Sequence, residues 1–162
     1  PHLDAVAETR KIEDREASAD GIVQIPGALR LLNSIPRGRW AVVTSGTRFL
    51  AVNRMKKFGI PVPEIMVTAD DVSNGKPDPE PYLRAAALLG EAPGECVVLE
   101  DSPRGIASAR AAGCPVIAVP SMPLPAGIAG EGDGPGRMVV ASLREVDLAR
   151  LRRVVISCAD GV

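Results

Sequence analysis

Short apolar runs alternate with helical segments of about ten residues, and this alternation constrains the fold more than any other feature. The runs are predicted to be buried strands and comprise residues 40–44, 65–67, 96–99, 116–119 and 138–141. The predicted helices between them comprise residues 47–58, 79–89 and 103–112, and a glycine follows each of them. Such an order favours βαβ units, and therefore a parallel sheet that helices cover on both faces.

Other segments lie outside this alternation. Residues 2–19 are charged and mixed, with apolar residues at helical spacing, and are predicted to form a helix. Pro26 is expected to open a second helix that runs to residue 33. Residues 123–136 are rich in glycine and proline and are predicted to be a loop. A helix is predicted for residues 143–152, and residues 154–156 form a last apolar run.

Composition limits the partners. The 162 residues suffice for one soluble globular domain, with 19 basic and 20 acidic residues and 2% aromatic residues. The basic residues are dispersed, so we expect neither a nucleic-acid nor a membrane partner. Cys96, Cys114 and Cys158 are far apart in the sequence. They predict no disulfide framework, and we expect a cytoplasmic protein.

Ligands of parallel sheets bind at the carboxyl ends of the strands, so the residues that follow each strand are of most interest. Thr44, Ser45, Gly46 and Thr47 lead from the first predicted strand into a helix. Hydroxyl groups and backbone N–H groups at the beginning of a helix favour an anion. The alternative is that Thr44 or Ser45 only caps the helix.

A lysine and a pair of carboxylates follow two further strands. Lys76 lies between Gly75 and Pro77, and a lysine on so stiff a loop can neutralise phosphoryl oxygens. The alternative is a solvated lysine in a turn. Glu100 and Asp101 are adjacent at a strand end, where their repulsion favours a hard divalent cation such as Mg²⁺. The alternative is a surface pair in which Asp101 or Ser102 caps the next helix. Together the three strand ends predict a site that binds phosphate against Mg²⁺.

The order of these motifs resembles the haloacid dehalogenase-like superfamily, in its branch of small sugar- and polyol-phosphate phosphatases. WAVVTSGTR, GKPDPEPYL and VVLEDSPRGIASARAAG are similar to the second, third and fourth motifs of that family. The resemblance spans about residues 22–120, and within the branch the sequence looks like glycerol-phosphate and 2-deoxyglucose-6-phosphate phosphatases.

The resemblance implies a three-layer Rossmann-like α/β fold, Mg²⁺ as cofactor, and hydrolysis of a small sugar or polyol phosphate through an aspartyl-phosphate. It implies residues 1–19 as a remnant of the helical cap and residues 20–162 as the hydrolase core. The implied site residues are Thr44 and Lys76 for catalysis, Thr44, Ser45, Gly46 and Lys76 for phosphate binding, and Glu100 and Asp101 for the metal.

The family's first motif, Asp-x-Asp-Gly-Thr or -Val on an N-terminal central strand, is absent ahead of residue 40. Its two aspartates act as nucleophile and as general acid and base. We therefore expect a sheet without its central strand, with apolar edges between the strands that end in Thr44 and Leu99, and without most of the cap. We also expect the chain as given to be inactive. The alternatives are a phosphomutase of the same superfamily and an inactive phosphate-binding module.

The C-terminal segment, residues 154–162, resembles that first motif, with Cys158 at the nucleophile position and Asp160 at the acid–base position. Short matches of this kind are common. The alternative is that this segment occupies the vacant central place in the sheet, but we interpret the match as a coincidence and predict no site residue there.

Overall fold

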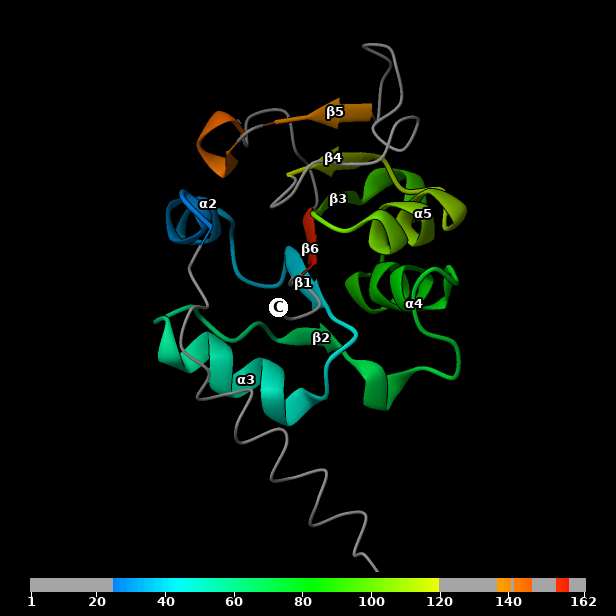
Figure 1. Cartoon of the computed structure of the whole chain (residues 1–162), viewed down its shortest axis with the longest axis horizontal. Coiled ribbons are helices and arrows are strands. Elements are labelled where there is room, and N and C mark those ends of the chain that lie inside the picture. Colours follow the sequence, from blue (N-terminus) through cyan, green and yellow to red (C-terminus); the bar gives the residue numbers. More distant parts are fainter. Residues whose placement is uncertain (1–24, 120–136, 141, 147–153, 158–162) are drawn as a thin grey trace, which may run out of the picture.

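The computed structural model describes residues 25–119, 137–140, 142–146 and 154–157. These residues form a six-stranded parallel sheet in the order β2-β1-β6-β3-β4-β5 (Figure 1). The strands are β1 (Trp40–Val43), β2 (Ile65–Val67), β3 (Val97–Glu100), β4 (Val116–Ala118), β5 (Arg137–Val139) and β6 (Val154–Ser157). The parallel α/β sheet predicted from the sequence is confirmed.

Helices lie on both sides of the sheet, with α2 and α3 on one side and α4 and α5 on the other (Figure 1). The helices are α2 (Ala28–Ser34), α3 (Arg48–Lys57), α4 (Glu80–Leu89) and α5 (Pro103–Ala111), and the 3₁₀ turns are η1 (Ala69–Asp71), η2 (Pro93–Glu95) and η3 (Leu143–Glu145). Gly90 and Gly113, which follow α4 and α5, have φ angles of 71° and 82°. Glycine adopts this left-handed conformation without a Cβ clash, so the predicted helix ends are confirmed.

The side chains of β1 alternate between the two faces of the sheet and reach two hydrophobic cores. Ala41 and Val43 belong to the core under α4 and α5, whereas Trp40 and Val42 belong to the core under α2 and α3. All four residues are buried, as expected for a strand covered on both faces. Both cores stabilise β1 and fix the position of its carboxyl end.

The centre of the sheet differs from the prediction. We expected a gap between the strands that end in Thr44 and Leu99, but β6 occupies this place and pairs in parallel with β1 and β3. Two neighbouring edges offer backbone donors and acceptors on both sides, and an apolar strand satisfies them. Our interpretation of the C-terminal segment as a coincidental match is therefore wrong for the strand itself, whereas Cys158 and Asp160 lie outside the described residues.

The helix predicted for residues 143–152 is wrong in its described part. Ser142 caps the single turn η3, and Val146 has extended backbone angles with a buried side chain. Burial of Val146 in the core under α2 and α3 outweighs the local helical pattern. The predicted helix at 2–19, the cap boundary at residue 19 and the loop at 123–136 lie outside the described residues.

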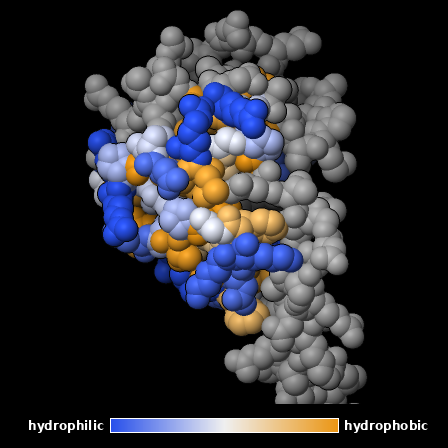
Figure 2. All heavy atoms as spheres, turned by 90° about the vertical axis from the view of Figure 1, so that its left-hand side faces the viewer, coloured by the Kyte–Doolittle hydropathy of each residue, from blue (hydrophilic) through white to orange (hydrophobic). Residues whose placement is uncertain are grey.

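The outer surface over α2 and α3 is mixed. Figure 2 shows hydrophilic residues on this side, with hydrophobic ones exposed between them. Within the described ranges, no helix combines the length and apolar character needed to cross a membrane.

Candidate functional site

Thr44 lies directly after β1, and its side chain is 8% exposed. Its Oγ1 accepts a hydrogen bond from the amide of Gly46 at 3.1 Å, so its own proton remains to donate. The capping role that we considered for Thr44 or Ser45 belongs instead to Thr47, whose side chain accepts from the amide of Leu50. The Gly46 amide bonds Thr44 in this structure, and its part in phosphate binding stays a prediction.

Hydrogen bonds to the segment after β2 fix the position of the loop that carries Thr44. The amide of Ala69 donates to the carbonyl of Gly46 at 3.1 Å, and Arg48 donates to Asp71 Oδ2 at 2.8 Å. Asp71 also accepts from the amide and hydroxyl of Thr68. Burial raises the pKa of Asp71, but the hydrogen bonds from Thr68 and the charge of Arg48 outweigh this effect and leave the pKa below its usual value.

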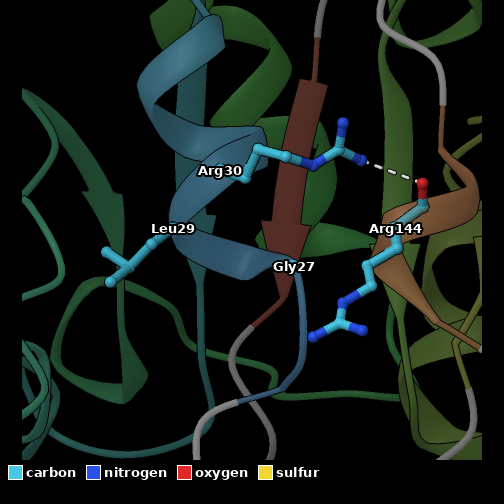
Figure 3. A pocket seen from close by; sticks show the side chains of 4 residues that line it. All are labelled: Gly27, Leu29, Arg30 and Arg144. Atoms are coloured by element: carbon cyan, nitrogen blue, oxygen red, sulfur yellow. Dashed lines mark hydrogen bonds between the residues drawn. The ribbon is translucent and has the colours of Figure 1, made fainter.

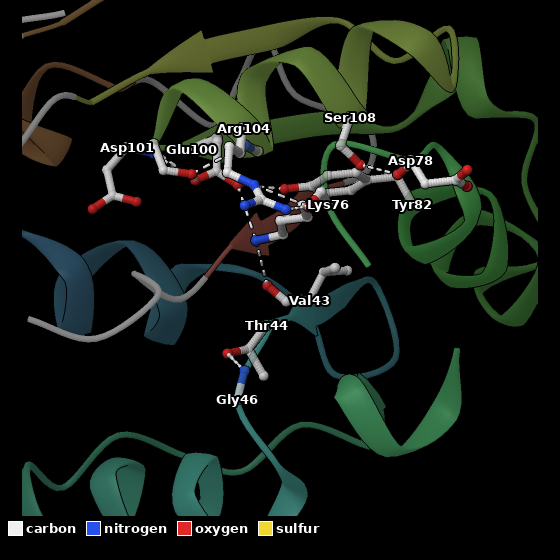
Figure 4. A network of polar contacts seen from close by, with 12 residues as sticks. Val43, Thr44, Gly46, Lys76, Asp78, Tyr82, Glu100, Asp101, Arg104 and Ser108 are labelled. Atoms are coloured by element: carbon white, nitrogen blue, oxygen red, sulfur yellow. Dashed lines mark hydrogen bonds and ion pairs between the residues drawn. The ribbon is translucent and has the colours of Figure 1, made fainter. Parts of the chain in front are cut away.

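Lys76 is buried, not solvated, with 3% of the residue exposed. Its Nζ donates to Glu100 Oε2 at 3.2 Å and to the carbonyl of Val43 at 3.4 Å. It also lies 5.6 Å from the centre of the Tyr82 ring. The ammonium group therefore lies between Glu100, at the end of β3, and Val43, at the end of β1 and directly before Thr44 in the sequence (Figure 4).

Glu100 is the acceptor around which this network forms. Oε2 accepts from Lys76 and from the hydroxyl of Tyr82 at 2.5 Å. Oε1 accepts from the amides of Asp101 and Ser102 and from the Ser102 hydroxyl, each at 3.0 Å. Both carboxylate oxygens are thus occupied by protein donors. This arrangement makes Glu100 the anchor of Lys76 and does not support its expected role as a metal ligand.

Asp101 is oriented differently. Figure 4 shows its carboxylate pointing away from the network around Glu100. Within the described parts of the chain, no group of three or more His, Cys, Asp or Glu side chains is placed to hold a metal ion. Mg²⁺ in phosphate sites is often held by one or two protein carboxylates together with water and substrate oxygens. Of the predicted pair, only Asp101 fits such a site.

Three residues that we did not predict support the anchor. Gly105, in the first turn of α5, has no side chain, and a Cβ there would overlap the carboxylate of Glu100. Tyr82 has no exposed surface. Arg104 donates to the carbonyl of Lys76 through Nε at 3.1 Å and through Nη2 at 2.5 Å. The motif spacing places all three near the site, but their contacts depend on how α4 and α5 pack.

A separate pocket lies between α2 and η3. It is lined by Gly27, Leu29, Arg30 and Arg144, and Arg30 donates to the carbonyl of Arg144 at 2.9 Å (Figure 3). None of the predicted site residues lines it. The strand ends, not this pocket, bring the predicted chemistry together.

Comparisons with known proteins agree with this geometry. Residues 3–119 match the family model of haloacid dehalogenase-like hydrolases. Hexitol phosphatase A of Escherichia coli is 50% identical over 119 residues, which cover 72% of this chain and 55% of that protein. Glycerol-1-phosphate phosphohydrolase 2 of Saccharomyces cerevisiae is 43% identical over 107 residues, which cover 60% of this chain and 43% of that protein.

A solved structure is similar as well. The HAD family hydrolase of Deinococcus radiodurans, with bound phosphate and sodium, is 29% identical with a TM-score of 0.65, and the match covers 92% of this chain and 67% of that one. The chain spans about half the length of the two curated relatives. On the family match, together with the arrangement of Thr44, Lys76 and Glu100, this chain belongs to the haloacid dehalogenase-like hydrolase family.

Proposed function

We propose that this chain forms the phosphate-binding core of a phosphomonoester hydrolase that acts on a small sugar or polyol phosphate. The observation that carries the proposal is the buried ammonium group of Lys76, which Glu100 and the carbonyl of Val43 hold beside Thr44. The names of the two curated relatives, a hexitol phosphatase and a glycerol-1-phosphate phosphohydrolase, support the substrate class.

The roles of the side chains follow from their hydrogen bonds. Thr44 accepts from the Gly46 amide, which leaves its hydroxyl proton to donate to a phosphoryl oxygen. Lys76 places one positive charge at the carboxyl edge of the sheet, where it stabilises the charge of the phosphoryl group. Because protein atoms surround this lysine, its charge acts in a low-dielectric environment and is fixed in position.

Asp101 is the proposed protein ligand of Mg²⁺, and Glu100 keeps its place in the Lys76 network. When bound, Mg²⁺ would supply positive charge that neutralises phosphoryl oxygens. The aspartate nucleophile that the family resemblance implies is not among the described residues. We therefore propose phosphate binding for this chain and hydrolysis through an aspartyl-phosphate for the whole enzyme.

Binding of inorganic phosphate in the presence of MgCl₂, measured by isothermal titration calorimetry, tests the proposal. Thr44→Val removes one hydrogen bond to a charged group and is expected to weaken binding about tenfold. Thr44→Ser keeps the hydroxyl and serves as the matched control. Equal affinities for the wild type and Thr44→Val would exclude this site.

Phosphate release from a panel of hexitol, glycerol and deoxyhexose phosphates then separates the candidate functions. Binding without release is expected for this chain as given. Mg²⁺-dependent release would show that the chain supplies its own nucleophile. Conversion of one sugar phosphate isomer into another, without free phosphate, would favour the phosphomutase alternative.

A further inference from the structure

The strand β6 lies in the middle of the sheet, although it comes from the end of the sequence. Val154 pairs with Trp40 on one side and with Val97 on the other, and the pairing continues to Ser157 beside Val43. Residues 3–119 carry the family match, so β6 lies outside it. The element at the centre of the sheet is therefore one that the family match does not include.

The position of β6 sets the spacing of the proposed site. β1 ends at Val43, directly before Thr44, and β3 ends at Glu100, and these two strands are separated by one intervening strand. Neighbouring strands lie about 4.8 Å apart, so β6 holds β1 and β3 at about twice that spacing. Lys76 spans the same interval, because it bonds Val43 on β1 and Glu100 on β3. Without β6, two unpaired edges would close together or separate, and Lys76 would lose one of its contacts.

We propose that the slot between β1 and β3 is a docking surface for the chain's own C-terminal strand, and that docking of β6 assembles the phosphate site. The occupant is β6 of the same chain, as the parallel pairing on both sides indicates. Recognition is through backbone hydrogen bonds along both neighbours, as in strand addition to a sheet, but with two edges instead of one. The phosphate part of this inference rests on the proposed function, whereas the docking part does not.

Amide hydrogen exchange of the full wild-type chain tests docking without any substitution. A central strand exchanges through the same cooperative opening as its neighbours. The amide exchange rates of residues 154–157 are therefore expected to lie within about tenfold of those of β1 and β3. Exchange of β6 that is far faster than that of β1 would overturn the proposal. A dimer in light scattering that exchanges β6 between copies would overturn the assignment to the same chain.

A proline pair tests the link to the site. Val155→Pro removes an amide donor inside β6, where both edges are paired, and is expected to undock the strand. Val139→Pro is the matched control on the edge strand β5. There the amide of Val140 donates to Ala118, so the amide of Val139 points away from β4. Val155→Pro should lower phosphate affinity at least tenfold, and Val139→Pro should not.

Adding a peptide of residues 153–162 to the full-length Val155→Pro variant completes the test. Recovery of phosphate binding, and of protection in β1 and β3, is the expected result. Protection that recovers without phosphate binding would refute the link between docking and the site. Slow exchange of β6 in a wild-type chain that binds no phosphate would refute the proposed function but leave docking intact. Unchanged protection of β1 and β3 in Val155→Pro would refute docking itself.

Discussion

Lys76 and Glu100 form an ion pair in which the two side chains are only 2% and 1% exposed, with 3.2 Å between Nζ and Oε2. Removing two charges from water is unfavourable, so such a pair persists only when further hydrogen bonds complete it. Tyr82 and Ser102 supply these bonds to Glu100. The position of Lys76 is consequently determined by the core of the protein and not by its own loop alone.

Glu100→Gln is expected to destabilise the protein by about 3–5 kcal/mol, because it leaves the ammonium group of Lys76 buried without its counter-charge. Urea unfolding followed by circular dichroism measures this loss. Glu95→Gln is the matched control, since Glu95 is exposed on η2 and its substitution should change stability by less than about 0.5 kcal/mol. Equal effects of the two substitutions would contradict the role of the ion pair.

Tyr82→Phe removes the hydroxyl that donates to Glu100 and keeps the buried ring beside Lys76. A hydrogen bond to a charged group contributes about 1.5–3 kcal/mol, so a loss of this size is expected in thermal or urea unfolding. Combining Tyr82→Phe with Glu100→Gln should give less than the sum of the single effects, because both remove the same contact. Additive losses would show that the two residues act independently.

Gly105→Ala is expected to destabilise the protein by about 1–3 kcal/mol, although alanine favours a helix more than glycine does. The added Cβ would lie 2.6 Å from Glu100 Oε1 and closer still to Oε2, so the carboxylate must move. Gly94→Ala is the control, because the nearest atom to its Cβ is 4.0 Å away. A Gly105→Ala variant as stable as wild type would show that α5 does not fix Glu100.

The contribution of Asp71 to stability is expected to depend on pH. Its pKa is depressed in the folded protein, so its stabilising effect is present above the unfolded pKa near 3.8 and is lost as pH falls through the folded value. At pH 7, Asp71→Asn should be less stable than wild type by about 1 kcal/mol, as for loss of a capping carboxylate. The free energies of unfolding of wild type and Asp71→Asn, measured at a series of pH values, should converge as the pH falls below about 4. A constant difference would contradict this prediction.

Cys158 is the next residue in the sequence after β6, and it lies outside the described residues. If β6 completes the site, Cys158→Asp should introduce a carboxylate nucleophile and raise the rate of Mg²⁺-dependent phosphate release about tenfold or more above wild type. Ala159→Asp adds the same charge one position further on and is the control. The same activity in both variants would contradict a specific role for position 158.

The sequence alone determined most of the local elements of this protein. Short apolar runs predicted β1 to β4, and the glycines after α3, α4 and α5 marked the helix ends, because such signals act over a few neighbouring residues. The motifs also placed Thr44, Lys76 and Glu100 at strand ends, where a parallel sheet brings them to one edge.

Only the tertiary structure decided how these elements combine. Pairing of β6 with β1 and β3 joins residues far apart in the sequence, and the short match of residues 154–162 to the motif of the central strand does not by itself establish this pairing. The role of Glu100 likewise depends on Tyr82 and Gly105, which reach it from two different helices. A carboxylate next to Asp101 suggests a metal ligand in the sequence, but packing of α4 and α5 surrounds Glu100 with donors and makes it the anchor of Lys76.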